Sequence, residues 1–264
     1  MKRREALTAL MATAAAGAMA AVPRVPARAG DAPSVSAACD AATGALGVVI
    51  ERASGSVLIV DWAARAVKSR VEGLGDLSHA SVVFSRDARF AYVFGRDGGL
   101  SKVDLVTGQL SARIIQAGNA IGGAISDDGR LLAVSNYEPG GVRVFDADTL
   151  APVCEISADP GTGKRSKTVG LVDAPGRRFV YTLYDAGEIW IADFTNMSSG
   201  MPSVTRFADV GKLPYDASIT SDGRHYIAGL FGEDGLVHLD LWQDAPKPRR
   251  ILDGYGRGEA PLPV

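Results

Sequence analysis

Short apolar runs separated by turn-forming residues recur along this chain. The segment Leu77–Asp104 is a clear case, because it holds three such runs separated by Ser-Arg-Asp-Ala-Arg and Gly-Arg-Asp-Gly-Gly. Runs of this length, rich in Val, Phe and Tyr and bounded by Gly, Asp and Ser, are typical of strands in antiparallel sheets. The 31 glycines among 264 residues suit many tight turns. We therefore expect an all-β protein.

Two markers repeat in register along the chain. The first is an aspartate that closes an alternating run, with separations of 43, 42, 47 and 47 residues: Asp61, Asp104, Asp146, Asp193 and Asp240. The second is a turn sequence that precedes another β-rich run: Asp87–Arg89, Asp128–Arg130, Pro175–Arg178 and Asp222–Arg224. A period of 40–50 residues with three or four short strands predicts a β-propeller. A β-sandwich, the alternative, does not explain two markers in register.

Within each unit we expect strand A before the turn marker, strand B after it, strand C ending at the repeated aspartate, and strand D last. For the second unit these strands fall at about 80–85, 89–95, 99–104 and 109–115. Residues 44–264 supply about five units, and the last lacks a complete strand D. We expect an incomplete, C-terminally truncated propeller. An unusually small ring is the alternative.

The first 29 residues are expected to be a signal peptide. Arg3 and Arg4 precede an Ala-rich apolar stretch, and Ala27–Ala29 offers a cleavage site. The paired arginines favour the twin-arginine route to the periplasm, with a Sec signal as the alternative. A linker would follow at 30–43. Lipid anchoring at Cys39 is less favoured, because its weak lipoprotein box lies far from the apolar stretch.

Several functional classes are disfavoured by what the sequence contains. The net charge is −2, which gives no global basic character for nucleic-acid binding. Cys39 and Cys154 form no recognisable disulfide framework, and no Cys-x-x-Cys-His motif predicts a covalent c-type haem. Zinc and calcium ligand spacings are also missing, and no Ser/His/Asp arrangement is legible.

One face of the predicted propeller should gather the chemically versatile residues. The B-to-C and D-to-A connections share a face in this fold. They hold three arginines, three lysines, three tyrosines, one aspartate and one histidine: Arg52, Arg96, Arg165, Lys164, Lys167, Lys212, Tyr137, Tyr184, Tyr215, Asp216 and His79. Arginine forks suit carboxylates, tyrosines can stack on a planar ring, and a histidine can ligate a metal carried by that ring. Alternatively, the histidine is a hydrogen-bonded structural residue and the charges are solvated loop residues.

The other histidines and the tryptophans are interpreted as structural. His225 and His238 fall on the B and C strands of the last unit. The three tryptophans are expected to pack between blades: Trp62, Trp190 and Trp242.

Several segments of the chain resemble a known family. Ser78-His79 followed by Ser85–Gly98 resembles the d1-haem propeller of cytochrome cd1 nitrite reductase, and Gly47–Ser56 and Lys164–Lys167 are similar to haem d1 biosynthesis proteins. The resemblance implies an eight-bladed propeller that binds haem d1 or its dihydro precursor. It implies that His79 is the axial ligand of the haem iron, and that Arg52 and Arg96 contact carboxylates.

The resemblance gives a leading hypothesis with two alternatives. The leading one is a periplasmic protein of haem d1 biogenesis that catalyses a late dehydrogenation, with Tyr215 or Asp216 as proton acceptor and with Lys164, Arg165, Lys167 and Tyr137 as further contacts to the tetrapyrrole. The alternatives are a non-catalytic chaperone that delivers haem d1 to nitrite reductase, and a protein-binding scaffold. Expected partners are the tetrapyrrole, cytochrome cd1 nitrite reductase and other maturation proteins. Homo-oligomerisation is left open. Without a distal histidine, nitrite reduction is not expected.

Overall fold

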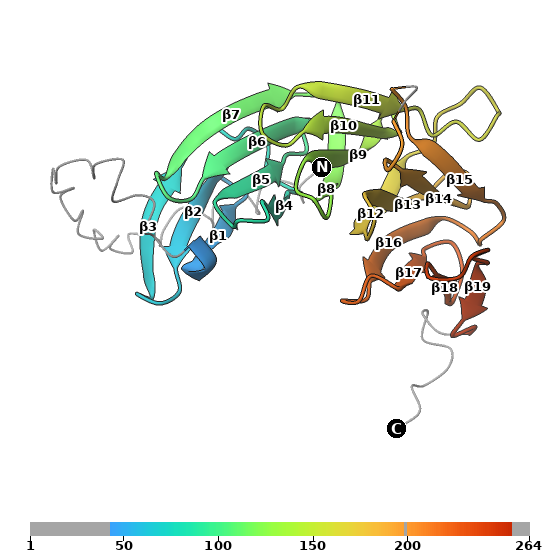
Figure 1. Cartoon of the computed structure of the whole chain (residues 1–264). Coiled ribbons are helices and arrows are strands. Elements are labelled where there is room, and N and C mark those ends of the chain that lie inside the picture. The colour runs from blue at the N-terminus through green and yellow to red at the C-terminus, as the bar shows by residue number, and fades with distance from the viewer. Residues whose placement is uncertain (1–42, 198–199, 255–264) are drawn as a thin grey trace, which may run out of the picture.

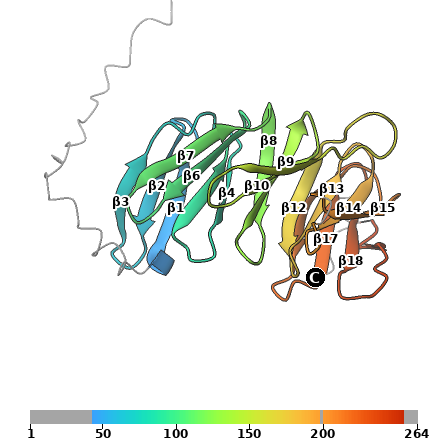
Figure 2. The ribbon, with the colours of Figure 1, turned by 45° about the horizontal axis from the view of Figure 1, so that its top comes forward.

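The computed structural model describes residues 43–197 and 200–254, and nearly all of their regular structure is β-strand. A single 3-10 turn, Thr43–Ala45, precedes the first strand. The described strands form five separate antiparallel sheets, which lie side by side along an arc (Figures 1 and 2). Within the described ranges no helix is long and apolar enough to cross a membrane. The predicted signal peptide, most of the linker and Cys39 lie outside the described residues.

Each sheet is a simple meander in which neighbouring strands in the chain pair with one another. The first sheet holds β1 (Leu46–Glu51), β2 (Ser56–Asp61) and β3 (Ala66–Val71). The second holds β4 (Ser81–Phe84), β5 (Phe90–Phe94), β6 (Gly99–Asp104) and β7 (Gln109–Ile115). The third holds β8 (Asn119–Ile125), β9 (Leu131–Glu138), β10 (Val142–Asp146) and β11 (Pro152–Ile156).

The last two sheets repeat the same plan. The fourth holds β12 (Thr168–Ala174), β13 (Arg178–Leu183), β14 (Glu188–Asp193) and β15 (Ser203–Phe207). The fifth holds β16 (Pro214–Ile219), β17 (His225–Leu230), β18 (Leu236–Asp240) and β19 (Arg249–Ile251). The strands of the second sheet agree with the boundaries expected from the sequence, and β19 is as short as expected. The all-β propeller fold is confirmed.

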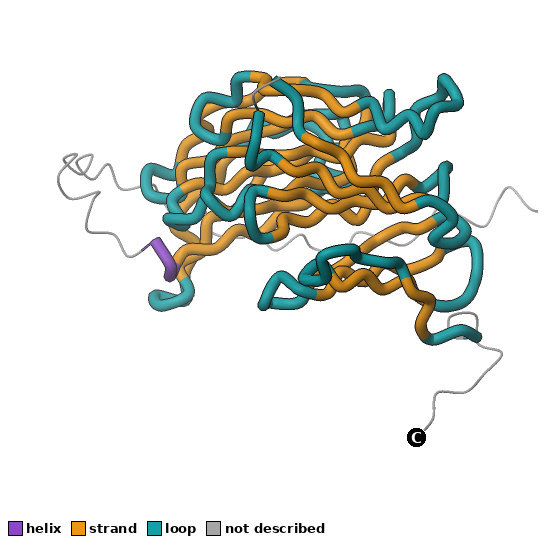
Figure 3. The backbone as a smooth tube through the Cα atoms, turned by 45° about the vertical axis from the view of Figure 1, so that its right-hand side comes forward, coloured by secondary structure: helices purple, strands orange, loops and turns teal. Residues whose placement is uncertain are grey.

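The sheets are arranged like the blades of a propeller. The first strands of successive four-stranded sheets, β4, β8, β12 and β16, are neighbours, whereas the fourth strands lie on the outside of the arc (Figure 1). Consequently the loops gather at the two ends of the strands, as Figure 3 shows. In the described first sheet, β1, β2 and β3 occupy the places of strands B, C and D.

The hydrophobic core lies between the sheets. Alternate residues of a strand point to opposite faces, so one strand serves two interfaces. On β13, Phe179 and Tyr181 pack toward the third sheet, whereas Val180 packs toward the fifth. Trp190 is buried as expected, but Trp62 and Trp242 are 65% and 60% exposed. The expectation that all three tryptophans pack between blades is therefore wrong for these two, which lie just beyond the ends of strands C.

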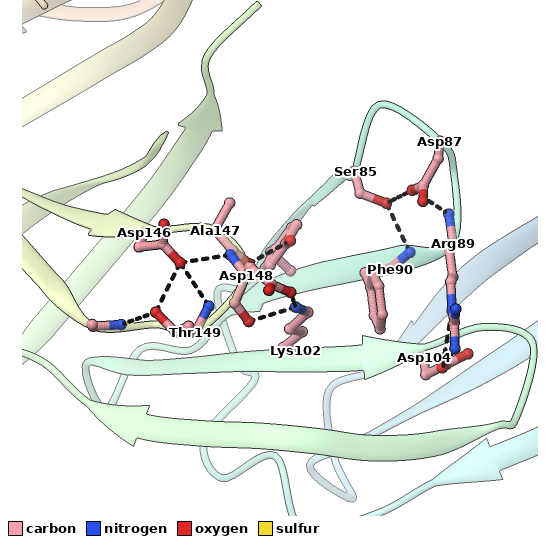
Figure 4. Close-up of polar contacts among 12 residues, drawn as sticks. Ser85, Asp87, Arg89, Phe90, Lys102, Asp104, Asp146, Ala147, Asp148 and Thr149 are labelled. Atoms are coloured by element: carbon pink, nitrogen blue, oxygen red, sulfur yellow. Dashed lines mark hydrogen bonds and ion pairs between the residues drawn. The ribbon is translucent and has the colours of Figure 1, made fainter. Parts of the chain in front are cut away.

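The repeated aspartates cap the turns that follow strand C. Asp104 accepts hydrogen bonds from the amides of Val106 and Thr107 at 2.8 and 3.0 Å, and Arg89 from the turn marker lies 3.0 Å from its carboxylate. Figure 4 shows this pair together with the Ser85–Asp87 turn. In the fifth sheet, the hydrogen-bonded Arg224 guanidinium holds the pKa of Asp240 well below its usual range. In the second and fifth sheets, both markers thus stabilise the turns of the blade.

A buried lysine joins the second sheet to the third. Lys102 is 5% exposed, and its Nζ donates to the backbone oxygen of Asp148 at 2.6 Å and to Asp148 Oδ1 at 3.1 Å (Figure 4). The same ammonium lies 4.2 Å from the centre of the Phe90 ring. A desolvated cation is tolerated here because a carboxylate, a carbonyl and an aromatic face all meet it.

Candidate functional site

Backbone hydrogen bonds tie each connection between sheets to a neighbouring B-to-C loop on one face, here called the loop face. The Arg96 amide donates to the Asp76 carbonyl at 2.8 Å, and the Tyr184 amide donates to the Lys167 carbonyl at 2.9 Å. The Phe231 amide donates to the Leu213 carbonyl at 3.0 Å. The two sets of loops singled out in the sequence therefore do meet on a common face.

Four aromatic residues from three sheets meet on the loop face, and we call them the aromatic cluster: Tyr137, Tyr184, Tyr215 and Phe231. Tyr137 lies near the end of β9, and Tyr184 and Phe231 directly follow β13 and β17. Tyr215 lies on β16. Its ring centre is 5.6 Å from that of Tyr184 and 5.6 Å from that of Phe231. Phe231 is 63% exposed, so the cluster offers aromatic surface to a ligand.

The hydroxyls of Tyr137 and Tyr215 are hydrogen-bonded to each other. Burial, together with this hydrogen bond, raises the pKa of Tyr137 well above its usual range. The raised pKa keeps this hydroxyl protonated even at alkaline pH, so Tyr137 can donate or accept a hydrogen bond but does not carry charge. Asp216 follows Tyr215 on β16, and its side chain is exposed.

In all five sheets, the residue at the end of strand B lies at a constant spacing from the repeated aspartate. The position nine residues before the repeated aspartate is occupied in turn by Arg52, Gly95, Tyr137, Tyr184 and Phe231. Arg96 follows directly after Gly95. The loop face thus has a cationic part over the first two sheets and an aromatic part over the last three.

Phe231 was missed by the sequence reasoning. The nine-residue spacing that it shares with Tyr137 and Tyr184 is the signal that would have identified it. Beside it, an open pocket of about 350 Å³ lies between the fourth and fifth sheets and is lined by residues that include Asp185, Lys212 and Gly232.

The cations of the long connection 157–167 differ in how they are held. Lys167 Nζ lies 3.0 Å from Asp185 Oδ1 and 5.4 Å from the centre of the Tyr184 ring, so it borders the aromatic cluster. Arg165 instead pairs with Glu155 on the outer strand β11. Lys164 is exposed. Of these three, Lys167 is the cation that the structure places against the aromatic residues.

His79 lies in the connection between β3 and β4 and is exposed. This connection is bonded to the loop that carries Arg96, so the histidine and the arginine belong to adjoining loops. Arg52 is exposed on the first B-to-C loop. Within the described ranges, the structure records no contact between His79 and the aromatic cluster. It therefore divides the predicted site residues into a part around His79 and a part around Tyr215.

The chemistry of the loop face suits one kind of ligand. Aromatic surface favours a planar ring, arginine and lysine favour carboxylates, and an exposed imidazole can ligate iron. Among the described residues there is no group of three or more His, Cys, Asp or Glu side chains that could hold a metal ion by itself. A metal already carried by a macrocycle needs only one such ligand from the protein, so the residues present fit a haem-like group.

The remaining two histidines are accounted for elsewhere. His225 Nδ1 and His238 Nε2 lie 2.9 Å apart on β17 and β18, where they hydrogen-bond to each other. This agrees with their interpretation as structural residues.

Comparison with known proteins identifies the family. Residues 41–264 match the family described as the cytochrome D1 heme domain. The chain belongs to this family. It is 63% identical to Protein NirF of Pseudomonas aeruginosa over 224 residues, which are 84% of this chain and 57% of that protein. The chain thus spans little more than half the length of this relative.

Solved structures agree on the fold. The dihydro-heme d1 dehydrogenase NirN in complex with DHE superposes with a TM-score of 0.70 at 28% identity, over 80% of this chain and 45% of that one. The β-propeller domain of Cps50 (Swd1) from Myceliophteria thermophila gives a TM-score of 0.63 at 14% identity, over 79% of this chain and 68% of that one. The second similarity concerns the fold alone.

Proposed function

We propose that the loop face binds haem d1 or its dihydro precursor, and that the protein acts late in haem d1 biogenesis. The observation that carries the proposal is the aromatic cluster, bordered by Lys167, on the loop face of a chain whose family is the cytochrome d1 haem domain. A tetrapyrrole is a planar ring with carboxylate substituents, and this combination of groups matches it.

The residues divide the work as follows. The macrocycle stacks on the aromatic cluster, and its carboxylates pair with Arg52, Arg96 or Lys167. His79 is the proposed axial ligand of the iron, which supplies redox chemistry when the group is bound. Lys164 can add a carboxylate contact from its exposed position. Arg165 contributes less in this proposal, because it pairs with Glu155 on the outer strand β11, whereas Lys167 lies against the aromatic cluster.

We propose dehydrogenation of the dihydro precursor as the reaction, with an electron acceptor outside this chain. The structural relative named dihydro-heme d1 dehydrogenase supports this choice. Asp216 is the favoured proton acceptor, because its carboxylate is exposed on an inner strand next to Tyr215. The Tyr215 hydroxyl is already hydrogen-bonded to Tyr137 and would orient the substrate. Location in the periplasm and transfer of product to cytochrome cd1 nitrite reductase complete the proposal.

Titration of the purified protein with dihydro-haem d1, followed by absorption spectroscopy, tests the proposal. We expect saturable binding with a spectrum that changes in His79→Ala. The matched control is His238→Ala, which removes a histidine from β18 and should leave the spectrum as it is in the wild type. Identical spectra for wild type and His79→Ala would refute the ligand role. Addition of an electron acceptor separates the two functions, because a chaperone binds without forming haem d1.

A further inference from the structure

We infer that Gly75 and the Asp97–Arg113 ion pair are positioning elements that hold the His79 connection against the Arg96 loop. This inference rests on the proposed function, which assigns ligand roles to His79 and Arg96. We place none of Gly75, Asp97 and Arg113 in contact with the ligand. They act by fixing the backbone from which the two binding side chains project.

The ion pair lies directly beneath the His79 connection. Arg113 projects from β7, and its Nη2 lies 2.5 Å from Asp97 Oδ2. Asp97 Oδ1 also accepts the Gly99 amide at 2.9 Å, which fixes the carboxylate within its own loop. The side chains of Arg113 and Asp97 are 22% and 31% exposed, so water screens the pair only partly. The pair is therefore partly shielded from solvent and tied to its own loop.

The backbone at Gly75 packs directly against this ion pair. Its φ is +81°, and a Cβ built there would lie 2.2 Å from both Arg113 Nη2 and Asp97 Oδ2. Such a distance is far inside van der Waals contact, and both atoms belong to the ion pair. With any other residue here, the ends of the Arg113 and Asp97 side chains would have to move away from the backbone of the connection.

A series of hydrogen bonds links the ion pair to the backbone next to His79. The Asp97 carboxylate accepts the Asp76 amide through a long bond of 3.4 Å, and the Asp76 carbonyl accepts the Arg96 amide at 2.8 Å. The Asp76 carboxylate in turn accepts the Ser78 amide at 2.9 Å, one residue before His79. A shift at Gly75 would thus move the His79 backbone relative to Arg96.

The chain provides a matched control two residues away. Gly73 lies in the same connection with φ +82°, but a Cβ there would meet nothing within 4 Å. Gly73→Ala and Gly75→Ala therefore carry the same left-handed backbone penalty. They differ in whether the added methyl group displaces the ion pair.

Hydrogen exchange of the ligand-free protein tests the positioning role directly. We expect the amides of Asp76, Ser78 and Arg96 to exchange at least about tenfold faster in Gly75→Ala than in Gly73→Ala, because local opening becomes easier. Rates within about twofold of each other would overturn the inference. If Gly75→Ala does not fold, Asp97→Asn replaces it and should accelerate the same amides, whereas Asp185→Asn in the fourth sheet should not.

Titration with dihydro-haem d1 then tests the link to the ligand. Gly75→Ala should bind about tenfold more weakly or show an altered spectrum, whereas Gly73→Ala should match the wild type. Faster exchange with unchanged binding and spectrum would overturn the link to His79. If the wild type itself does not bind, the proposed function fails, and the exchange rates still decide the positioning role.

Discussion

Phe231 provides the sharpest test of the aromatic part of the loop face. It is 63% exposed, although it contacts Tyr184 and Tyr215 at ring-centre distances of 6.4 and 5.6 Å. Phe231→Ala should therefore cost little folding stability. A bound macrocycle would cover the exposed ring, so the substitution should weaken binding.

The size of the effect follows from the exposed area. A phenylalanine presents roughly 200 Å² in an extended chain, so about 125 Å² remains open at Phe231. Complete covering at about 25 cal/mol per Å² would contribute about 3 kcal/mol, and covering of one half about 1.5 kcal/mol. We therefore expect the dissociation constant for dihydro-haem d1 to rise by about 10- to 100-fold.

The assay is an equilibrium titration followed by absorption, with Trp242→Ala as the control. Trp242 is also an exposed aromatic residue, at 60%, but it follows strand C of the fifth sheet at the opposite end of the strands from Phe231. Its removal should leave the affinity unchanged. A change below twofold in Phe231→Ala, or equal losses in both variants, would refute the stacking role.

Two predictions concern stability. Lys102→Met should lower the free energy of unfolding by about 1–3 kcal/mol, because charge-assisted hydrogen bonds to Asp148 are lost. The stabilities are compared by urea titration, with Lys68→Met as the control, because the exposed Lys68 also donates to carbonyls of the next sheet. The control substitution should lower the free energy of unfolding by about 0.5 kcal/mol. Equal losses in the two variants would contradict a special role for the burial of Lys102. Burial raises the pKa of Tyr92 to about 12 in the folded protein, above the value of about 10 in the unfolded chain. The contribution of the neutral Tyr92 hydroxyl to the free energy of unfolding is therefore complete below pH 10 and is lost as the pH rises from 10 to 12. Thermal melts between pH 8 and 12 should show a shallower alkaline decline for Tyr92→Phe than for the wild type, and parallel declines would argue against this titration.

The sequence contained most of the information on the blades. Strands such as β6 and β7 were predictable because hydrophobic alternation and turn residues are local signals. The Lys102 contact was not, since its partner Asp148 lies on another sheet, 46 residues away. The same holds for Arg165, which counts as a free cation in the sequence but pairs with Glu155 in the structure.

The candidate site was predictable in part for a related reason. Topology alone brings the B-to-C loops and inter-sheet connections to one face, so His79 and Tyr215 could be placed there. Topology does not say how far apart two residues lie on that face. Periodicity does not encode side-chain packing across sheets. That packing determines the contacts within the aromatic cluster, the exposure of the Phe231 ring and the close approach of Gly75 to the Asp97–Arg113 pair.

Hydrogen exchange with and without dihydro-haem d1 tests whether the tetrapyrrole binds to the loop face, because it locates the ligand without any substitution. We expect slower exchange of the bound protein on the loop face, at 52–55, 72–80, 95–98, 184–187 and 231–235. The turns at 85–89, 126–130 and 220–224, at the opposite end of the strands, should stay unchanged. Slower exchange in those turns would contradict the proposal that the loop face is the tetrapyrrole site. So would unchanged exchange on both faces.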